Sequence, residues 1–176
     1  EDSLRRLGTD YVDLYTLHVG ATDAELDEII DEFEALKKSG KIRAYCWSTG
    51  DENLVRKFID RSRGDSIMHA VNVFDYSPEI LRACEANNYA SINIFPLAMG
   101  MLSGKYRAES RMSPDEVRGA GHLWVSYFKD GKPVPAYLEK LAAVREILTS
   151  NGRTLTQGAL AWIWAKSPNT IPIPGF

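Results

Sequence analysis

Polar and chemically reactive residues come directly after apolar runs that are typical of β-strands. The candidate strand ends read Leu17-His18, Trp47-Ser48-Thr49, Phe74-Asp75 and Phe95-Pro96. Parallel βα proteins place their chemistry at the carboxyl ends of their strands. We therefore expect these residues to mark the active face of the protein.

The segment 96–105 combines glycines with a lysine, a composition that suits phosphate binding. Gly100 and Gly104 permit a close approach of the backbone to a ligand. Main-chain N–H groups and the Lys105 ammonium can then bind a pyrophosphate. Many loops contain glycine and lysine without binding anything, so the residues alone leave both interpretations open.

The histidines and cysteines do not have the spacing of a metal site, and we expect no metal. His69 and His122 lack partners at ligand spacing, and Cys46 is far from Cys84 in the sequence. We expect both thiols to lie in the core without forming a disulfide, which fits a reducing cytoplasm.

The elements that position these residues follow a strand–helix repeat. Strands are expected near 11–17, 42–48, 67–74 and 90–95, with a short candidate at 170–176. Helices are expected behind each strand, ending near residues 40, 61 and 87, and at 136–150 and 156–166. Their expected N-terminal caps are the capping boxes Thr22–Glu25, Thr49–Glu52 and Thr154–Gln157, and the pair Ser77-Pro78. Right-handed crossovers predict a parallel α/β sheet, which is either doubly wound or part of a closed barrel.

The segment 96–135 breaks this rhythm, with one short helical candidate after Ser113-Pro114. A connection this long is typical of a functional loop or lid. It contains Trp124, Tyr127 and Phe128. These aromatic residues either line a substrate pocket or pack the loop onto the rest of the protein.

Composition places the chain among ordinary soluble proteins. It has 176 residues, 44% hydrophobic and 26% charged, with a formal net charge of −3. This length and composition suit a single domain spanning residues 1–176, and the charge argues against nucleic-acid or membrane-surface binding. No apolar run is long enough to cross a bilayer, and no signal peptide opens the sequence, so we expect a cytoplasmic location. The first residue is Glu1, which suggests an excised or cleaved part of a longer protein.

Several segments resemble, in order, the signatures of the aldo-keto reductase family. They are residues 6–18, 40–48, 72–75 and 96–106, together with 160–163 followed by 171–175. They are similar to that family's strands four, five and six, the loop after strand seven, and the last helix with strand eight. A complete (β/α)8 barrel needs roughly 200 residues or more, so the resemblance implies an incomplete TIM barrel that contains strands four to eight.

The resemblance implies an NADPH-dependent oxidoreductase that reduces aldehydes or ketones to alcohols. In that family a tyrosine delivers the proton, tuned by a lysine and an aspartate from earlier strands, and a histidine orients the carbonyl. Only the histidine, His18, matches within this chain, so we expect the chain alone to be inactive. Without the resemblance, the residues alone favour a histidine that is satisfied at a strand end over a functional one.

The cofactor implied by the resemblance is NADP(H). The residues implied to contact it are Ser48, Thr49, Met68, Phe95, Pro96, Leu97, Ala98, Gly100, Lys105, Gly175 and Phe176. Ser48 and Thr49 match a pair that binds the nicotinamide carboxamide, although the second position is more often Asn and Thr49 also suits a helix cap. The family usually has a Gln near Met68, and a thioether cannot replace its hydrogen bonds. Either the register differs by a residue or carboxamide recognition is weaker here.

Two further expectations concern the class and assembly of the protein. The departures at Thr49 and Met68 motivate an alternative function, a non-catalytic nucleotide-binding sensor or subunit of the same fold. A partial barrel has two open strand edges, so we expect self-association or pairing with a missing amino-terminal segment.

Overall fold

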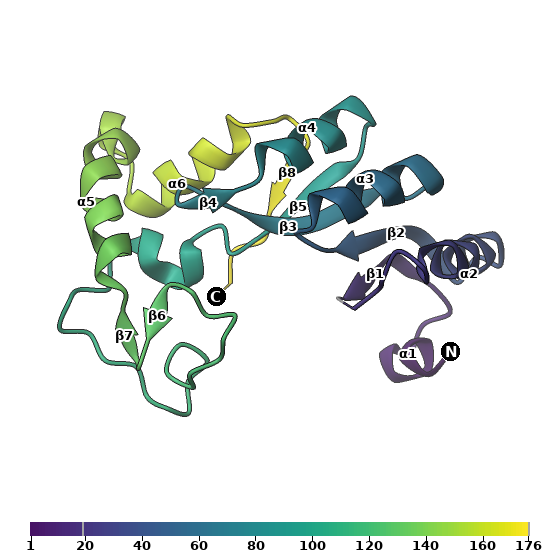
Figure 1. The fold of residues 1–176 in the computed structure, drawn as a ribbon, viewed down its shortest axis with the longest axis horizontal. Coiled ribbons are helices and arrows are strands. Elements are labelled where there is room, and N and C mark those ends of the chain that lie inside the picture. Colours follow the sequence, from purple (N-terminus) through teal and green to yellow (C-terminus); the bar gives the residue numbers. More distant parts are fainter. Residues whose placement is uncertain (19, 176) are drawn as a thin grey trace. The chain divides into compact units, whose positions relative to one another are not determined.

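Strands and helices alternate through most of the chain in the computed structural model, which describes residues 1–18 and 20–175 (Figure 1). The main strands are β1 (Val12–His18), β2 (Ile42–Ser48), β3 (Ser66–Asn72), β5 (Ala90–Ile94) and β8 (Thr170–Pro172). They form one sheet in the order β1-β2-β3-β5-β8, in which β1 pairs with β2 and β2 pairs with β3 in parallel. The short β4 (Asp75–Tyr76) pairs antiparallel with β3.

Six α-helices accompany these strands in the described part of the chain. They are α1 (Asp2–Leu7), α2 (Leu26–Lys38), α3 (Glu52–Arg61), α4 (Pro78–Ala86), α5 (Pro135–Leu148) and α6 (Leu155–Trp164). Short 3-10 turns occur at η1 (Ala98–Ser103) and η2 (Ser150–Gly152), and a small hairpin joins β6 (Phe128–Lys129) to β7 (Lys132–Pro133). The five longer helices that were predicted are therefore confirmed to within a few residues, whereas α1 was not predicted.

Two of the predicted helix caps are confirmed. Ser77 accepts a hydrogen bond from the Ile80 amide at 3.2 Å, with Pro78 at the first helical position. Thr154 and Gln157 form a complete capping box at the start of α6. Each cap depends only on residues within one turn of helix, which is why the local sequence was sufficient to find it.

The predicted capping box Thr49–Glu52 is wrong. The cap of α3 is Asp51, whose carboxylate accepts from the amides of Asn53 and Leu54 at 2.9 and 3.1 Å. The Thr49 hydroxyl instead accepts from the Asp51 amide at 3.2 Å, one turn earlier. The aspartate wins because its charged oxygen binds the exposed amides at a helix N-terminus better than a hydroxyl does.

The capping box predicted at Thr22–Glu25 forms only in part. The Glu25 carboxylate accepts from the Thr22 amide at 2.9 Å, as predicted. The Thr22 hydroxyl donates to that same carboxylate at 2.7 Å, so it is not the cap of α2, which begins only at Leu26.

The third strand ends earlier than predicted, and the helix expected after Ser113 does not form. β3 ends at Asn72 because its side-chain oxygen accepts from the amides of Phe74 and Asp75, which turns the chain into β4. After Ser113 the chain forms successive turns and folds back closely at Gly119. A Cβ at Gly119 would lie 2.0 Å from the Ser113 carbonyl oxygen, a clash that a regular helix does not create.

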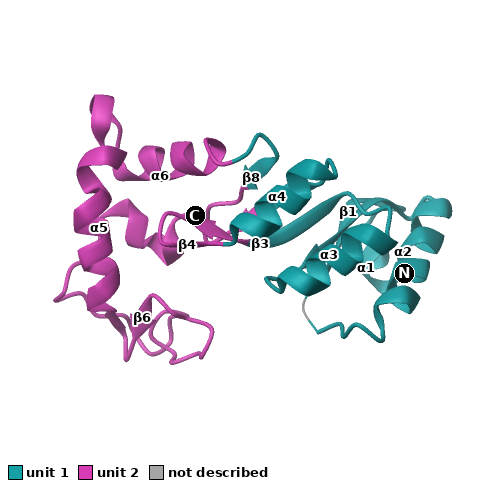
Figure 2. Ribbon diagram, turned by 45° about the horizontal axis from the view of Figure 1, so that its top comes forward, with its two compact units in different colours: residues 1–69, 77–92, 167–171 teal, residues 70–76, 93–166, 172–176 magenta. Residues whose placement is uncertain are grey.

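The chain divides into two compact units that interleave along the sequence (Figure 2). Unit 1 comprises residues 1–69, 77–92 and 167–171, and unit 2 comprises residues 70–76, 93–166 and 172–176. The chain passes back and forth between the units, so no single linker separates them.

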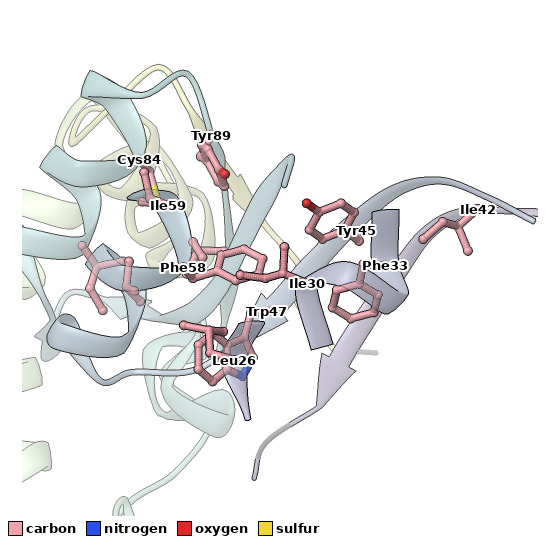
Figure 3. Packing of buried hydrophobic residues seen from close by; sticks show 13 residues of the cluster. Leu26, Ile30, Phe33, Ile42, Tyr45, Trp47, Phe58, Ile59, Cys84 and Tyr89 are labelled. Carbon is pink, nitrogen blue, oxygen red and sulfur yellow. The ribbon is translucent and has the colours of Figure 1, made fainter. Parts of the chain in front are cut away.

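The core of unit 1 is formed by buried side chains from its strands and its helices. Phe58 of α3 is fully buried at its centre and makes edge contacts with Tyr45, Trp47 and Tyr89 at ring distances of 5.6 to 6.4 Å (Figure 3). Cys46 and Cys84 are buried and free, as predicted. Burial raises the pKa of the Cys84 thiol to about 12, so it is poorly reactive.

The core of unit 2 is built differently, because loops supply much of it. Ala98, Met101 and Leu102 of η1 are fully buried among side chains of α5, α6 and the long segment. Tyr127 and Phe128 belong to this core, with 3% and 4% of their surfaces exposed. Of the two alternatives for these aromatics, packing therefore applies to Tyr127 and Phe128, whereas Trp124 remains 56% exposed.

Candidate functional site

In unit 1, the strand register aligns three of the predicted site residues in one row. His18 of β1 pairs with Ser48 of β2, and Ser48 pairs with Met68 of β3. Directly paired residues of parallel strands project to the same face of the sheet. The preceding residues, Leu17, Trp47 and Ile67, pack in the core of unit 1, so the row projects to the opposite face.

The row is equipped to bind a polar ligand. His18 is exposed and Ser48 is 7% exposed, and neither side chain makes a hydrogen bond within the described residues. Their ring nitrogens and hydroxyl can therefore donate to or accept from a ligand. Met68 contributes a thioether, but its main-chain carbonyl already accepts from the Thr49 amide at 3.0 Å.

In unit 2, the loop after β5 has an unusual backbone. Phe95, Ala98 and Met99 have φ of 52°, 49° and 54°, and Gly100 has φ of 94°. Non-glycine residues in this left-handed region cost of order 1–3 kcal/mol each and are concentrated at functional sites. Four left-handed residues within six positions mark this loop, which we call the β5 loop (residues 95–104), as a constrained segment.

Several main-chain amides of the β5 loop donate hydrogen bonds to carbonyls of the same loop. The Ala98 amide donates to the Phe95 carbonyl at 2.8 Å, and the Gly100 and Leu102 amides donate to the Leu97 carbonyl at 2.9 and 3.1 Å. The predicted contacts Pro96 and Leu97 lie at the start of this turn, with Pro96 buried. These hydrogen bonds hold the loop in one shape without the help of a ligand.

A cation stands beside the tightest part of the loop. Lys105 is exposed and makes no ion pair within the described residues, and its Nζ lies 5.0 Å from the centre of the Tyr106 ring. A Cβ at Gly100 would lie 3.2 Å from Tyr106 Cε2 and 3.5 Å from Lys105 Cε. Gly100 is therefore closely packed against Tyr106 and lies next to Lys105, whose positive charge suits a phosphate.

Sequence reasoning missed Arg118, which braces the same loop. Its Nε donates to the Met99 carbonyl at 2.8 Å, and its guanidinium lies 5.9 Å from the centre of the Tyr106 ring. Arg118 also pairs with Glu116. No local pattern relates an arginine in the long segment to a carbonyl 19 positions earlier, so the sequence carried no signal for it.

Sequence reasoning also missed Asn72, which is completely buried at the end of β3. Its side-chain nitrogen donates to the Phe95 carbonyl at 3.1 Å and to the Tyr127 hydroxyl at 2.8 Å. Burial raises the pKa of Tyr127 to about 12, so the phenol stays neutral at physiological pH.

An aromatic stack borders the β5 loop. Phe95 stacks on Trp124 at 6.2 Å between ring centres, and Trp124 stacks on His122 at 5.6 Å. Phe95 therefore combines a strained backbone with a side chain that packs against a large aromatic ring. Gly175 is exposed, and Phe176 lies outside the described residues.

The described residues contain neither a cluster of metal ligands nor a membrane-spanning helix. No three side chains among His, Cys, Asp and Glu gather closely enough to hold a metal ion in the part of the chain that the structure describes. Within residues 1–18 and 20–175, none of the helices has the length and hydropathy of a membrane-spanning segment.

Comparison with known proteins gives one consistent result. The model of the aldo/keto reductase family matches residues 1–176. The uncharacterized oxidoreductase YqkF of Bacillus subtilis is 39% identical over 104 residues, which are 58% of this chain and 34% of that protein. The aldo-keto reductase yakc [NADP(+)] of Schizosaccharomyces pombe is 28% identical over 185 residues, which cover 98% of this chain and 51% of that protein.

Among solved structures, the holo form of the aldo-keto reductase AKR11C1 from Bacillus halodurans is 29% identical, with a TM-score of 0.74. The alignment covers 99% of this chain and 55% of that one. The chain thus spans about half the length, or less, of the relatives that it matches.

Proposed function

The chain belongs to the aldo/keto reductase family, and from that membership we propose that the complete protein reduces aldehydes or ketones to alcohols with NADPH. Solved members of the family carry NADP or NADPH. When bound, the nicotinamide supplies the hydride. The observation that carries the proposal is the register that puts His18 beside Ser48 at the strand ends, with both side chains free of hydrogen bonds to described residues.

We assign β1, β2, β3, β5 and β8 to strands four to eight of an eight-stranded barrel. Their order in the sheet and the coverage of about half of the relatives support this assignment. The proton donor and the two residues that tune it would then come from outside this chain.

Four of the predicted residues have assigned tasks in this proposal. His18 donates a hydrogen bond to the carbonyl oxygen, where negative charge develops during reduction. Ser48 and the neighbouring Thr49 bind the carboxamide of the nicotinamide. Lys105 binds the pyrophosphate beside Gly100, and its charge, which makes no ion pair within the described residues, fits that group.

Nucleotide binding is the most direct test of these assignments. We expect the chain to bind NADPH, and Lys105→Met to weaken that binding about tenfold, because a phosphate loses its charged partner. Lys129→Met, which removes an exposed lysine from the hairpin of unit 2, is the matched control and should change the Kd less than about twofold. NADPH fluorescence measures both. Equal affinities of the two variants would refute the assignment of Lys105.

Turnover is tested separately. Carbonyl reduction, followed by loss of NADPH absorbance, should occur in the complete protein and should be absent from the 176-residue chain alone. In the complete protein His18→Ala should lower kcat more than about 100-fold while it leaves the Kd for NADPH nearly unchanged. Reduction by the chain alone would contradict the assignment of the proton donor to another segment.

One observation favours a second candidate, a non-catalytic nucleotide-binding sensor or subunit. Met68 occupies the position beside Ser48, where a thioether cannot bind a carboxamide as an amide would. Tight NADPH binding by the complete protein without turnover of any aldehyde or ketone would support this candidate over the enzyme.

We also propose that the chain associates through the open edge of β1. β1 ends the sheet, and its Leu14 and Tyr15 are 37% and 40% exposed. An unpaired strand edge with apolar side chains favours pairing with another segment or another copy. A single monomeric mass in light scattering, with cooperative melting, would refute this association.

A further inference from the structure

The strained shape of the β5 loop requires an explanation, because a non-glycine residue does not adopt it unaided. Phe95 has a φ of 52° and opens the loop directly after β5. A residue in this region relaxes to an extended conformation unless its surroundings over-determine it. The contacts of the Phe95 main chain therefore decide whether the loop keeps its shape.

Two donors meet at the Phe95 carbonyl. One is the Ala98 amide at 2.8 Å, which closes the first turn of the loop, and the other is Asn72 Nδ2 at 3.1 Å. The first bond is local to the loop. The second ties the loop to the end of β3, 23 positions earlier in the sequence.

Asn72 is itself fixed in orientation. Its Oδ1 accepts from the amides of Phe74 and Asp75 at 2.9 and 3.1 Å, and its Nδ2 makes a second bond to the Tyr127 hydroxyl at 2.8 Å. Two backbone amides can only face an acceptor, so the amide group has one possible orientation. All four hydrogen-bonding positions of a completely buried side chain are thus in use.

We infer that Asn72 is a positioning residue for cofactor binding, which locks the β5 loop in its phosphate-binding shape before the nucleotide arrives. Tyr127 is the second anchor, since it ties the amide of Asn72 to the long segment. The inference rests on the proposed function for the role of the loop, but the lock itself is a property of the free chain. Preorganising a loop increases affinity because less conformational entropy is lost on binding.

Three variants distinguish the effect of Asn72 on the β5 loop from a general loss of stability. Asn72→Asp keeps the acceptor for Phe74 and Asp75 and, when ionised, loses both donated bonds. Tyr127→Phe removes only the hydroxyl partner and leaves the bond to Phe95. Asn169→Asp is the matched control, because the Asn169 amide also donates to two carbonyls, those of Cys84 and Tyr89, but in unit 1.

Hydrogen exchange of the free chain is the first measurement. Asn72→Asp should raise exchange of the Ala98 and Gly100 amides about tenfold, while strands β1 and β2 keep their protection. Tyr127→Phe should have a smaller effect in the same loop, and Asn169→Asp should have none there. Unchanged exchange of the Ala98 amide in Asn72→Asp, or an equal rise in β1 and β2, would overturn the lock.

Affinity for NADPH is the second measurement. Asn72→Asp should raise the Kd about tenfold and Asn169→Asp less than about twofold, and in the complete enzyme the KM for NADPH should rise more than kcat falls. Faster loop exchange with an unchanged Kd would overturn the role in binding. If the unsubstituted chain binds no NADPH, the role in binding fails with the proposed function, whereas the exchange result still decides the lock.

Discussion

The two units position their candidate site residues by different means. In unit 1, His18, Ser48 and Met68 lie abreast because three strands pair in register. In unit 2, the β5 loop keeps its shape because the buried Asn72 and the partly buried Arg118 bind its carbonyls. Of the six non-glycine residues with positive φ among those described, all but Asn88 belong to unit 2.

This difference shows how backbone strain is distributed. A sheet places side chains accurately without backbone strain, but its extended strands cannot wrap the backbone closely around a ligand. A strained loop can do so, at a cost that nearby hydrogen bonds must offset. We therefore expect substitutions in the core of unit 1 to affect mainly stability, and substitutions in the β5 loop to affect nucleotide binding as well.

The largest expected effect is in the core of unit 1. Phe58→Ala should lower the free energy of unfolding by about 3–5 kcal/mol, because it opens a cavity beneath three aromatic rings. Ile147→Ala, which truncates a side chain that is 72% exposed, should cost less than about 0.5 kcal/mol. Urea denaturation measures both, and a loss under about 1 kcal/mol for Phe58→Ala would show that the core of unit 1 does not set stability.

The next effect is the acid sensitivity of unit 1. His69 is 2% exposed, its Nε2 lies 2.8 Å from Ser91 Oγ, and burial lowers its pKa to about 4. The unfolded chain binds a proton near pH 6.5, so stability is full above that pH and is lost as the pH falls toward 4. Between pH 7 and 5 the loss should be roughly 2 kcal/mol.

The variant His69→Gln isolates this contribution, because glutamine keeps a nitrogen toward Ser91 but does not titrate. Its unfolding free energy should fall by less over the same pH range than that of the unsubstituted chain. Parallel pH profiles for the two proteins would exclude His69 as the source of acid sensitivity.

A smaller effect is expected in the β5 loop. Gly100→Ala should cost about 1–2 kcal/mol, because φ is 94° and the new Cβ would lie 3.2 Å from Tyr106. Gly50→Ala in unit 1 has no neighbour within 4 Å and no positive φ, so it should change stability by less than about 0.5 kcal/mol. We also expect Gly100→Ala to weaken NADPH binding, whereas Gly50→Ala should leave it unchanged.

The smallest effect concerns the aromatic stack of unit 2. Trp124→Ala should cost about 0.5–1 kcal/mol, because the indole is 56% exposed and its main contacts are the rings of Phe95 and His122. Leu123→Ala, at a fully exposed neighbour, should change nothing measurable. A loss above about 3 kcal/mol for Trp124→Ala would mean that the stack, more than hydrogen bonds, supports the β5 loop.

The sequence predicted the regular parts of the fold better than the irregular ones. The caps Ser77 and Thr154 were found because each binds an amide only three residues away. The cap of α3 was misassigned because Thr49, Asp51 and Glu52 all suit the start of a helix, and the pattern alone did not show that the Asp51 carboxylate binds the exposed amides.

The candidate site shows the same division. His18 and Ser48 could be chosen from the ends of strand-like runs and Met68 from the family resemblance, and the alignment of the three follows from parallel pairing. Asn72 and Arg118 could not be chosen in this way. Asn72 donates to groups 23 and 55 positions away, and Arg118 donates to a carbonyl 19 positions away. The sequence pattern does not record such distant partners.

The interleaving of the two units has a consequence for biosynthesis. Residues 167–171 follow most of unit 2 in the sequence but belong to unit 1, and the Asn169 side chain among them donates to the Tyr89 carbonyl, 80 positions earlier. Residues 172–175 belong to unit 2, where Ile173 donates to the Asn93 carbonyl at 3.1 Å. Neither unit can therefore be completed before residues 167–175 have been translated, and a nascent polypeptide that stalls before these residues leaves both units unfinished.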